Sequence, residues 1–196
     1  MGQPTRAAAT AGLILAAGLG TRFGGRKLLA PIYGKPMLQH VLDVAAQADL
    51  EPVVVVLGTD ADELLSACTW RKEARVINAE PSAGIARSVQ LGLAELALSD
   101  AIRVAVLLGD QPFLSKDQLL TIIRATGPIV VPRFEGRPGN PVVLDRAEWP
   151  KAAALEGDRG FSQLFGVVSD PISYVDVPGT NPDIDSVADL AAISRA

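Results

Sequence analysis

Short apolar segments rich in β-branched residues alternate along this chain with longer segments whose apolar residues recur at helical spacing. The first kind predicts strands, and the second predicts helices. Residues 53–57 and 104–108 are apolar at every position, which is typical of strands covered on both faces. We predict strands over residues 12–17, 53–57, 74–78, 103–108, 129–132, 141–144 and 173–177. We predict helices over residues 36–48, 60–69, 85–98, 116–125, 146–154, 161–167 and 186–194. This alternation indicates an α/β fold: a three-layer α/β/α sandwich with a Rossmann-like, mostly parallel sheet.

Several predicted helices begin with residues that favour a helix start. Pro36 stands at a predicted first helical position, where a missing N–H costs nothing. Three pairs have the spacing of a capping box or a related N-cap. They are Asp60 with Glu63, Ser115 with Gln118, and Ser186 with Asp189.

The length of 196 residues suits one domain with an ample core, so residues 1–196 are expected to form a single domain. We expect residues 1–10 to be flexible. Residues 132–141 are rich in glycine and proline, and we predict a hairpin-like excursion there that lies over the functional site.

Composition excludes several classes of protein. No uncharged apolar stretch reaches the roughly 18 residues of a membrane span, and the apolar run at residues 13–17 is too short for a signal peptide. The net charge of −4 argues against general nucleic-acid binding. Cys68 is the only cysteine, so internal disulfides and a cysteine zinc cluster are excluded. We expect a cytoplasmic enzyme with no nucleic-acid or membrane partner.

Positive charge and glycine gather near the start of the chain. The first 42 residues contain five Lys or Arg and no Asp or Glu. Residues 15–27 place Arg22, Arg26 and Lys27 among four glycines, directly after a predicted strand. Glycine lets backbone N–H groups turn toward a ligand, and a concave run of such groups with cations nearby binds anions. The segment predicts a site for a small polyanion such as a nucleotide, although a flexible strand-to-helix turn is the alternative.

This glycine loop fits neither of two common phosphate motifs. A Walker loop needs Lys directly after its second glycine and then Ser or Thr, whereas Arg26 and Lys27 follow Gly25. The dinucleotide fingerprint needs a third glycine where this chain has Phe23. The second mismatch weighs against an NAD(P)H- or flavin-dependent oxidoreductase, which stays an alternative class.

Carboxylates from two distant segments could complete a site beside the glycine loop. Asp110 follows a predicted strand, so we expect it at the same edge of the sheet as the loop. A carboxylate there would repel a nucleotide unless a cation lay between them, and Mg²⁺ takes one or two carboxylates together with phosphate oxygens. Asp183 and Asp185, before the last predicted helix, could supply a second carboxylate. Turn formation by Asp110 and helix capping by the other two are the alternatives.

The complete loop, LAAGLGTRFGGRKLLAP followed by GKPML, resembles the signature of nucleotidyltransferases with the MobA-like NTP-transferase fold, which is of the nucleotide-diphospho-sugar transferase type. Within that group the sequence is most similar to the molybdenum cofactor cytidylyltransferases. The likeness spans nearly the whole chain. Its later segments are LGDQP at residues 108–112, GNPV at 139–142, GDRG at 157–160 and DIDS at 183–186.

The resemblance implies roles for the matching residues. Lys27 is implied to contact the triphosphate and support the transition state, Arg22 to neutralise the leaving pyrophosphate, and Asp110 to act with them in catalysis. Asp110 and Asp185 are the implied metal ligands, with Asp183 as a weaker candidate. The residues implied to bind the nucleotide are Leu15, Ala16, Ala17, Gly18, Gly20, Arg22, Lys27, Gly84, Ser88 and Asp110. By itself, Ser88 fits a helix-start residue equally well.

Finer expectations depend on three positions. Guanylyl-transferring relatives tend to have glycine where this chain has Ala17, and the additional methyl group narrows the slot toward a pyrimidine. The family usually has His where this chain has Asn140, and its GDxGAR segment departs from this chain after Asp158. Asn140 and Asp158 are therefore candidate acceptor-binding residues, in the part of the chain that matches the family pattern less well.

The expected function is Mg²⁺-dependent transfer of CMP from CTP to a phosphorylated small-molecule acceptor, molybdopterin, with release of pyrophosphate. The alternatives are transfer of GMP, a non-molybdopterin acceptor, and a nucleotide-binding module without catalysis. Contact with a molybdenum enzyme or its chaperone stays open.

Overall fold

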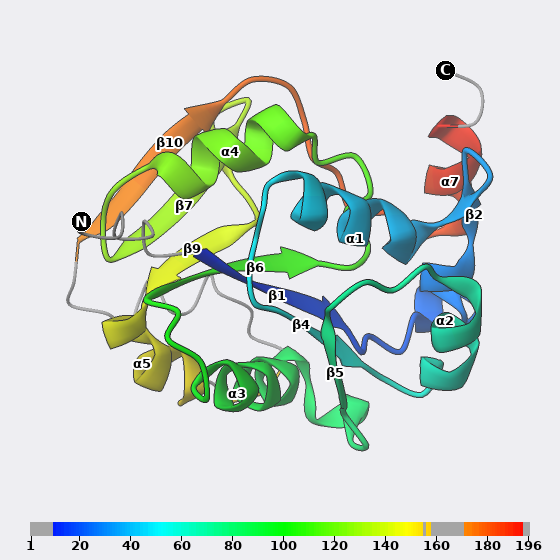
Figure 1. Cartoon of the computed structure of the whole chain (residues 1–196). Coiled ribbons are helices and arrows are strands. Elements are labelled where there is room, and N and C mark those ends of the chain that lie inside the picture. The colour runs from blue at the N-terminus through cyan, green and yellow to red at the C-terminus, as the bar shows by residue number, and fades with distance from the viewer. Residues whose placement is uncertain (1–9, 155, 158–170, 194–196) are drawn as a thin grey trace, which may run out of the picture.

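A single eight-stranded sheet runs through the protein, with helices on both of its faces (Figure 1). The computed structural model describes residues 10–154, 156–157 and 171–193. The strands of the sheet are β1 (Thr10–Ala16), β4 (Val53–Leu57), β5 (Ala74–Ile77), β6 (Arg103–Leu108), β7 (Ile129–Phe134), β8 (Arg137–Pro138), β9 (Val142–Asp145) and β10 (Ile172–Val177). A two-stranded ribbon is formed by β2 (Pro31–Ile32) and β3 (Lys35–Pro36). The α-helices are α1 (Met37–Gln47), α2 (Ala61–Ala67), α3 (Ile85–Leu96), α4 (Lys116–Arg124), α5 (Trp149–Ala153) and α7 (Val187–Ile193).

The sheet is mostly parallel. Its strands lie in the order β10-β7-β9-β6-β1-β4-β5, with β8 paired to the end of β7. β1 pairs in parallel with both β4 and β6, and β5 and β10 are parallel to their neighbours. β9 lies antiparallel between β6 and β7. The predicted α/β sandwich with a mostly parallel sheet is therefore confirmed.

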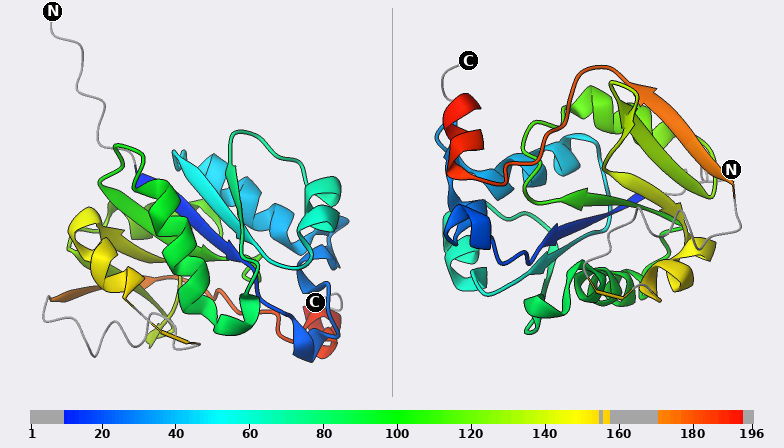
Figure 2. Two further views of the ribbon diagram at one scale, coloured as in Figure 1. Left: turned by 90° about the horizontal axis from the view of Figure 1, so that it is seen from below. Right: turned by 180° about the vertical axis from the view of Figure 1, so that it is seen from behind.

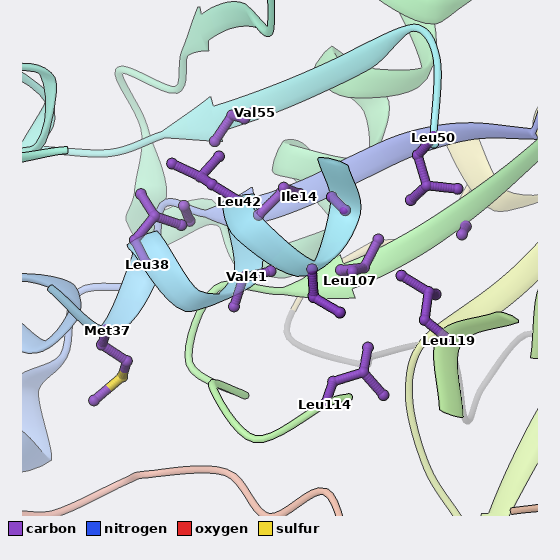
Figure 3. Packing of buried hydrophobic residues seen from close by; sticks show 14 of the residues in the cluster. Ile14, Met37, Leu38, Val41, Leu42, Leu50, Val55, Leu107, Leu114 and Leu119 are labelled. Atoms are coloured by element: carbon purple, nitrogen blue, oxygen red, sulfur yellow. The ribbon is translucent and has the colours of Figure 1, made fainter. Parts of the chain in front are cut away.

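Two apolar cores hold the three layers together. Successive strand residues face opposite sides of a sheet, so an unbroken apolar strand supplies both cores. On β1, Ile14 packs in the core with α1, α2 and α4, whereas Leu13 packs in the core with α3 and α5. Figure 2 shows these helices on the two sides of the sheet. Figure 3 shows Leu38 and Leu42 of α1 over the strand residues of the first core. In the part of the chain described here, no helix combines the length and apolar character needed to cross a membrane.

All seven predicted strands are present, and six of the predicted helices fall within three residues of an observed helix. The predicted helix at residues 161–167 lies outside the described residues, as do residues 1–9. Thr10, the last residue predicted to be flexible, instead begins β1 and pairs with Arg103. The two-residue strands β2, β3 and β8 were not predicted, because segments so short carry no periodicity. Pro36 was wrongly placed inside a helix: its ψ of 142° is extended, and α1 begins one residue later.

Two of the three predicted helix caps are confirmed. Ser115 Oγ accepts a hydrogen bond from the Gln118 N–H at 3.2 Å, and Gln118 Oε1 accepts one from the Ser115 N–H at 2.8 Å. Ser186 and Asp189 exchange equivalent bonds at the start of α7. The prediction for Asp60 is wrong. That residue has φ −91° and ψ 18°, outside the extended conformation of a typical N-cap, and its side chain makes no capping bond.

Replacing Ser115 by alanine is expected to lower the free energy of unfolding by about 1 kcal/mol, because the Gln118 N–H at the start of α4 loses its partner, the Ser115 hydroxyl. Urea denaturation measures the change. Ser66→Ala is the matched control, since the Ser66 hydroxyl only bonds back to the Asp62 carbonyl on an exposed helix face and should change stability by less than about 0.5 kcal/mol. Equal losses in both variants would contradict a capping role for Ser115.

Candidate active site

The carboxyl ends of the central parallel strands meet at one edge of the sheet, where ligands bind in folds of this kind. The Gly109 N–H donates to the Leu15 carbonyl at 2.9 Å, which joins the ends of β6 and β1. The Asn78 N–H donates to the Leu57 carbonyl at 2.8 Å and joins the ends of β5 and β4 in the same way. The glycine loop, Asp110 and the segment before α3 therefore leave the sheet at one edge.

The glycine loop folds back on itself through two short 3-10 turns, Thr21–Phe23 and Lys27–Leu29. The Phe23 and Gly25 N–H groups both donate to the Gly20 carbonyl, at 2.9 and 3.0 Å. Gly20 has φ +58°, and a Cβ built there would lie 3.1 Å from Lys27 Cβ. Glycine is favoured at this position because it permits the left-handed conformation and leaves room for the Lys27 stem.

A cleft of about 410 Å³ opens between this loop and the start of α3. Nine of the ten predicted nucleotide-binding residues line it. They are Leu15, Ala16, Ala17, Gly18, Gly20, Lys27, Gly84, Ser88 and Asp110. Arg22 does not line the cleft, and its side chain is 80% exposed. The volume is of the size that small-molecule sites have.

Lys27 joins the two predicted metal-binding carboxylates. Its Nζ lies 2.7 Å from Asp110 Oδ2 and 2.9 Å from Asp185 Oδ1. The Lys27 side chain is only 11% exposed, and those of Asp110 and Asp185 are 28% and 46% exposed. Arg22 Nη1 lies 3.1 Å from the other oxygen of Asp185. The three predicted catalytic residues and Asp185 thus form one charged cluster, of which Lys27 and Asp110 line the cleft.

A main-chain contact brings the C-terminal segment to Asp110. The Ile184 N–H donates to the Asp110 carbonyl at 3.1 Å, and the Ile184 side chain is buried in the core beside α1. The following residue, Asp185, is held from the other side, because its N–H donates to Asp189 Oδ2 at 3.1 Å. These contacts fix Asp185 opposite Asp110 although 75 positions separate the two in the chain.

These contacts favour the charged forms of Lys27 and Asp185. Burial alone would lower the pKa of Lys27, but the hydrogen bonds and negative charges of Asp110 and Asp185 outweigh it and raise that pKa. The hydrogen bond from Lys27 and its positive charge lower the pKa of Asp185. Partial burial, with the negative charges of Asp110 and Asp185 nearby, raises the pKa of Asp183.

Asp183 belongs to a neighbouring amide network and not to the Lys27 contacts. Its Oδ1 accepts from Gln111 Nε2 at 2.6 Å, and Gln111 Oε1 accepts from Asn181 Nδ2 at 3.1 Å. Asn181 Nδ2 also donates to the backbone carbonyl of Asn140 at 3.0 Å. Asn140, at the end of the β7–β8 hairpin, therefore reaches this network through its main chain. Asp158, the other predicted acceptor residue, lies outside the described residues.

Sequence reasoning missed Asn78, a buried residue directly after β5. Its side-chain Nδ2 donates to Ser88 Oγ at 3.0 Å, and its Oδ1 accepts from the Glu80 N–H at 2.9 Å. Since the amide occupies a lone pair of the hydroxyl oxygen, Ser88 retains its proton to donate to another group. A lone Asn after a strand has no distinctive sequence signal, so only its position at a strand end could have suggested it.

Residues 12–172 match the model of the MobA-like NTP transferase domain, so the chain belongs to that family. The bifunctional protein GlmU of Xanthomonas oryzae pv. oryzae is 32% identical over 148 residues, which make up 74% of this chain and 32% of that protein. GlmU of Bordetella petrii is 37% identical over 118 residues, 59% of this chain and 26% of the relative. The chain thus spans about a third or less of the length of these relatives.

Solved structures with the same fold cover nearly the whole chain. Rv0371c of Mycobacterium tuberculosis superposes with a TM-score of 0.86 at 28% identity, over 97% of this chain and 100% of that one. A structure of Rv0371c in complex with manganese gives 0.84 at 28% identity, over 96% and 99%. A 4-diphosphocytidyl-2C-methyl-D-erythritol synthase from Anaerococcus prevotii gives 0.77 over 95% of each chain, but at 18% identity it supports the fold alone.

Proposed function

We propose that this protein is a metal-dependent nucleotidyltransferase that transfers CMP from CTP to a phosphorylated acceptor, with molybdopterin favoured, and releases pyrophosphate. One observation carries the proposal: Lys27 contacts Asp110 and Asp185 at a cleft whose wall is the glycine loop. Family membership supports nucleotidyl transfer. The base and the acceptor rest on the resemblance of the loop to cytidylyltransferases.

In the proposed reaction, an oxygen of the acceptor phosphate attacks the α-phosphorus of the nucleotide. The bond from that phosphorus to the oxygen bridging the α- and β-phosphates breaks, and pyrophosphate leaves with that oxygen. A phosphate nucleophile is already anionic near neutral pH, so positioning and charge stabilisation can supply most of the catalysis. The lining of the cleft agrees with a reaction that needs no strong general base. Among the described residues that line it, the ionisable side chains are Lys27 and Asp110.

Asp110 and Asp185 would hold the metal. Within the described residues, no group of three or more His, Cys, Asp or Glu side chains could hold an ion. A two-carboxylate site suits a magnesium ion that takes its other oxygens from phosphate and water. When bound, such an ion acts as a Lewis acid on the phosphoryl group. Lys27 would bind the triphosphate as a mobile charge, and the forked guanidinium of Arg22 would bind the leaving pyrophosphate.

Base recognition is proposed for the end of the cleft formed by Gly84, Ser88 and Ala17. With its oxygen engaged by Asn78, Ser88 is set to donate a hydrogen bond, and the O2 carbonyl of cytosine is a suitable acceptor. Ala17 is buried beside Gly58, and it lines the cleft where the base would bind. Its methyl group would leave less room there for a purine than for a pyrimidine.

Replacing Ala17 by glycine is expected to shift the ratio of turnover with CTP to turnover with GTP about tenfold toward GTP, because one methyl group in a shaped pocket discriminates by about that factor. Pyrophosphate release with each nucleotide measures the ratio. Ala30→Gly is the matched control, because it makes the same substitution just beyond the glycine loop at a residue that does not line the cleft. An unchanged ratio in Ala17→Gly would remove Ala17 from base selection.

The function itself is tested by pyrophosphate release from each of the four ribonucleoside triphosphates with Mg²⁺ or Mn²⁺, with and without molybdopterin. Release that needs CTP, metal and molybdopterin together supports the full proposal. Release with GTP or only with another phosphorylated acceptor would change the substrate but keep the class. CTP that raises the melting temperature without release under any condition would favour the non-catalytic binding module.

A further inference from the structure

The ammonium group of Lys27 lies between the two carboxylates that the proposed function assigns to the metal. Its Nζ is within hydrogen-bond distance of an oxygen on each of them. We propose, on the basis of that proposed function, that Lys27 is an internal counterion that must leave Asp110 and Asp185 before a divalent cation can bind there. We further propose that the nucleotide triphosphate draws Lys27 away, so that metal and nucleotide bind as a coupled pair.

The competition follows from the donors and acceptors involved. An ammonium group has three N–H donors and no acceptor, so a metal ion that binds between the same two carboxylates competes with Lys27 for that position. The charges of the four clustered side chains also favour competition between Lys27 and a metal ion. Asp110 and Asp185 together carry two negative charges, and Lys27 and Arg22 together carry two positive ones. A free divalent cation therefore meets two carboxylates that already have cationic partners, although Asp183 and Asp189 add negative charge nearby.

The position of Lys27 lets it serve two anions in turn. Its backbone is held in a short 3-10 turn whose next residue, Leu28, is buried in the core. Its side chain contacts the two carboxylates and also lines the cleft beside the glycine loop. A lysine stem has four flexible carbons, so its ammonium can turn from the carboxylates to a phosphate in the cleft without movement of the main chain.

Reciprocity then makes the coupling measurable from either ligand. If the triphosphate releases the carboxylates, it must strengthen metal binding by the same factor as the metal strengthens nucleotide binding. Metal alone should bind weakly to the wild-type protein. Removing the Lys27 ammonium should strengthen binding of the metal alone and abolish most of the nucleotide effect on it.

The direct test is binding of Mn²⁺ alone, measured by electron paramagnetic resonance on full-length protein without nucleotide. Lys27→Met keeps most of the stem and removes the charge, and it is expected to bind Mn²⁺ at least about tenfold tighter than the wild type. Lys27→Gln repeats the comparison with a polar side chain. Circular dichroism establishes that each variant is folded.

Two arginine variants separate displacement from a general change in charge. Arg22→Gln also removes a cation that contacts Asp185, but Arg22 is highly exposed, so the affinity for Mn²⁺ should rise by less than about threefold. Arg26 lies in the same loop but pairs with Glu63 and not with Asp110 or Asp185. Arg26→Gln should therefore leave the affinity for Mn²⁺ unchanged. Equal gains in the Lys27 and Arg22 variants would overturn the displacement of Lys27 in favour of simple electrostatics.

Two further arms complete the test. Adding Asp110→Asn to Lys27→Met should abolish the tighter binding, and its persistence would place the ion elsewhere and overturn the inference. A CTP analogue with an α,β-methylene group should tighten Mn²⁺ binding by the wild type about tenfold and affect Lys27→Met much less. An unchanged Mn²⁺ affinity in Lys27→Met without nucleotide would overturn the inference even if the enzyme transferred nucleotides. Tighter binding in that variant, with no pyrophosphate release by the wild type, would leave the displacement standing and reject the proposed function.

Discussion

Replacing Asp110 by asparagine is expected to lower nucleotidyl transfer about a thousandfold or more while the protein stays folded, because a preorganised charge at the reacting phosphate is removed. Asparagine has nearly the same shape but lacks the negative charge with which a carboxylate attracts a divalent cation. The fold should tolerate the change, since the contact to Ile184 is made by the Asp110 backbone carbonyl. Pyrophosphate release over a range of Mn²⁺ concentrations measures the loss.

Asp183→Asn is the matched control for Asp110→Asn. Asp183 precedes the same helix as Asp185 and is near enough to Asp110 for the Asp110 charge to raise its pKa, but its hydrogen bond is to Gln111. Its replacement should reduce turnover by less than about tenfold and leave the metal dependence unchanged. Full turnover in Asp110→Asn would remove Asp110 from the metal site. A larger loss in Asp183→Asn than in Asp185→Asn would make Asp183 the second ligand.

The strands and helices could be predicted because their patterns are local. A run such as the one in β4 is apolar at every position and is buried on both faces, so composition alone identifies it. The order of the strands could not be predicted in this way. Nothing in residues 141–144 indicates that β9 enters antiparallel between β6 and β7, because its partners are chosen by packing between distant segments.

The candidate site was predictable in its residue types but not in its contacts. The glycine loop and the acidic segments could each be noticed separately, and the family resemblance paired Asp110 with Asp185. Only the structure shows that Lys27 joins them, since that contact spans 158 positions and leaves no local pattern. The same holds for Asn78, whose two side-chain bonds depend on the packing of α3 against the end of β5.

Replacing Gly58 by alanine is expected to weaken nucleotide binding about a hundredfold, because a displacement of about 1 Å in a binding loop can have an effect of that size. A Cβ at Gly58 would lie 2.9 Å from both Cα and O of Ala17. Both contacts are with main-chain atoms, so no change of rotamer can relieve them. Gly58 directly follows β4, and Ala17 directly follows β1 and lines the cleft, so the new methyl group pushes on the glycine loop at Ala17. Calorimetric titration with CTP and Mg²⁺ measures the change in affinity.

Gly92→Ala separates this effect from a general loss of stability. A Cβ at Gly92 would also collide with a β1 residue, but the residue is Leu13 in the core beneath α3, and the contacts are with its side chain. This variant should lose about 1–3 kcal/mol of unfolding free energy through overpacking and keep its affinity for CTP. Equal affinity losses in both variants would attribute the effect to instability. Normal CTP binding by Gly58→Ala would show that the loop can shift without cost, which would contradict the rigid, preformed cleft on which the proposed base selection depends.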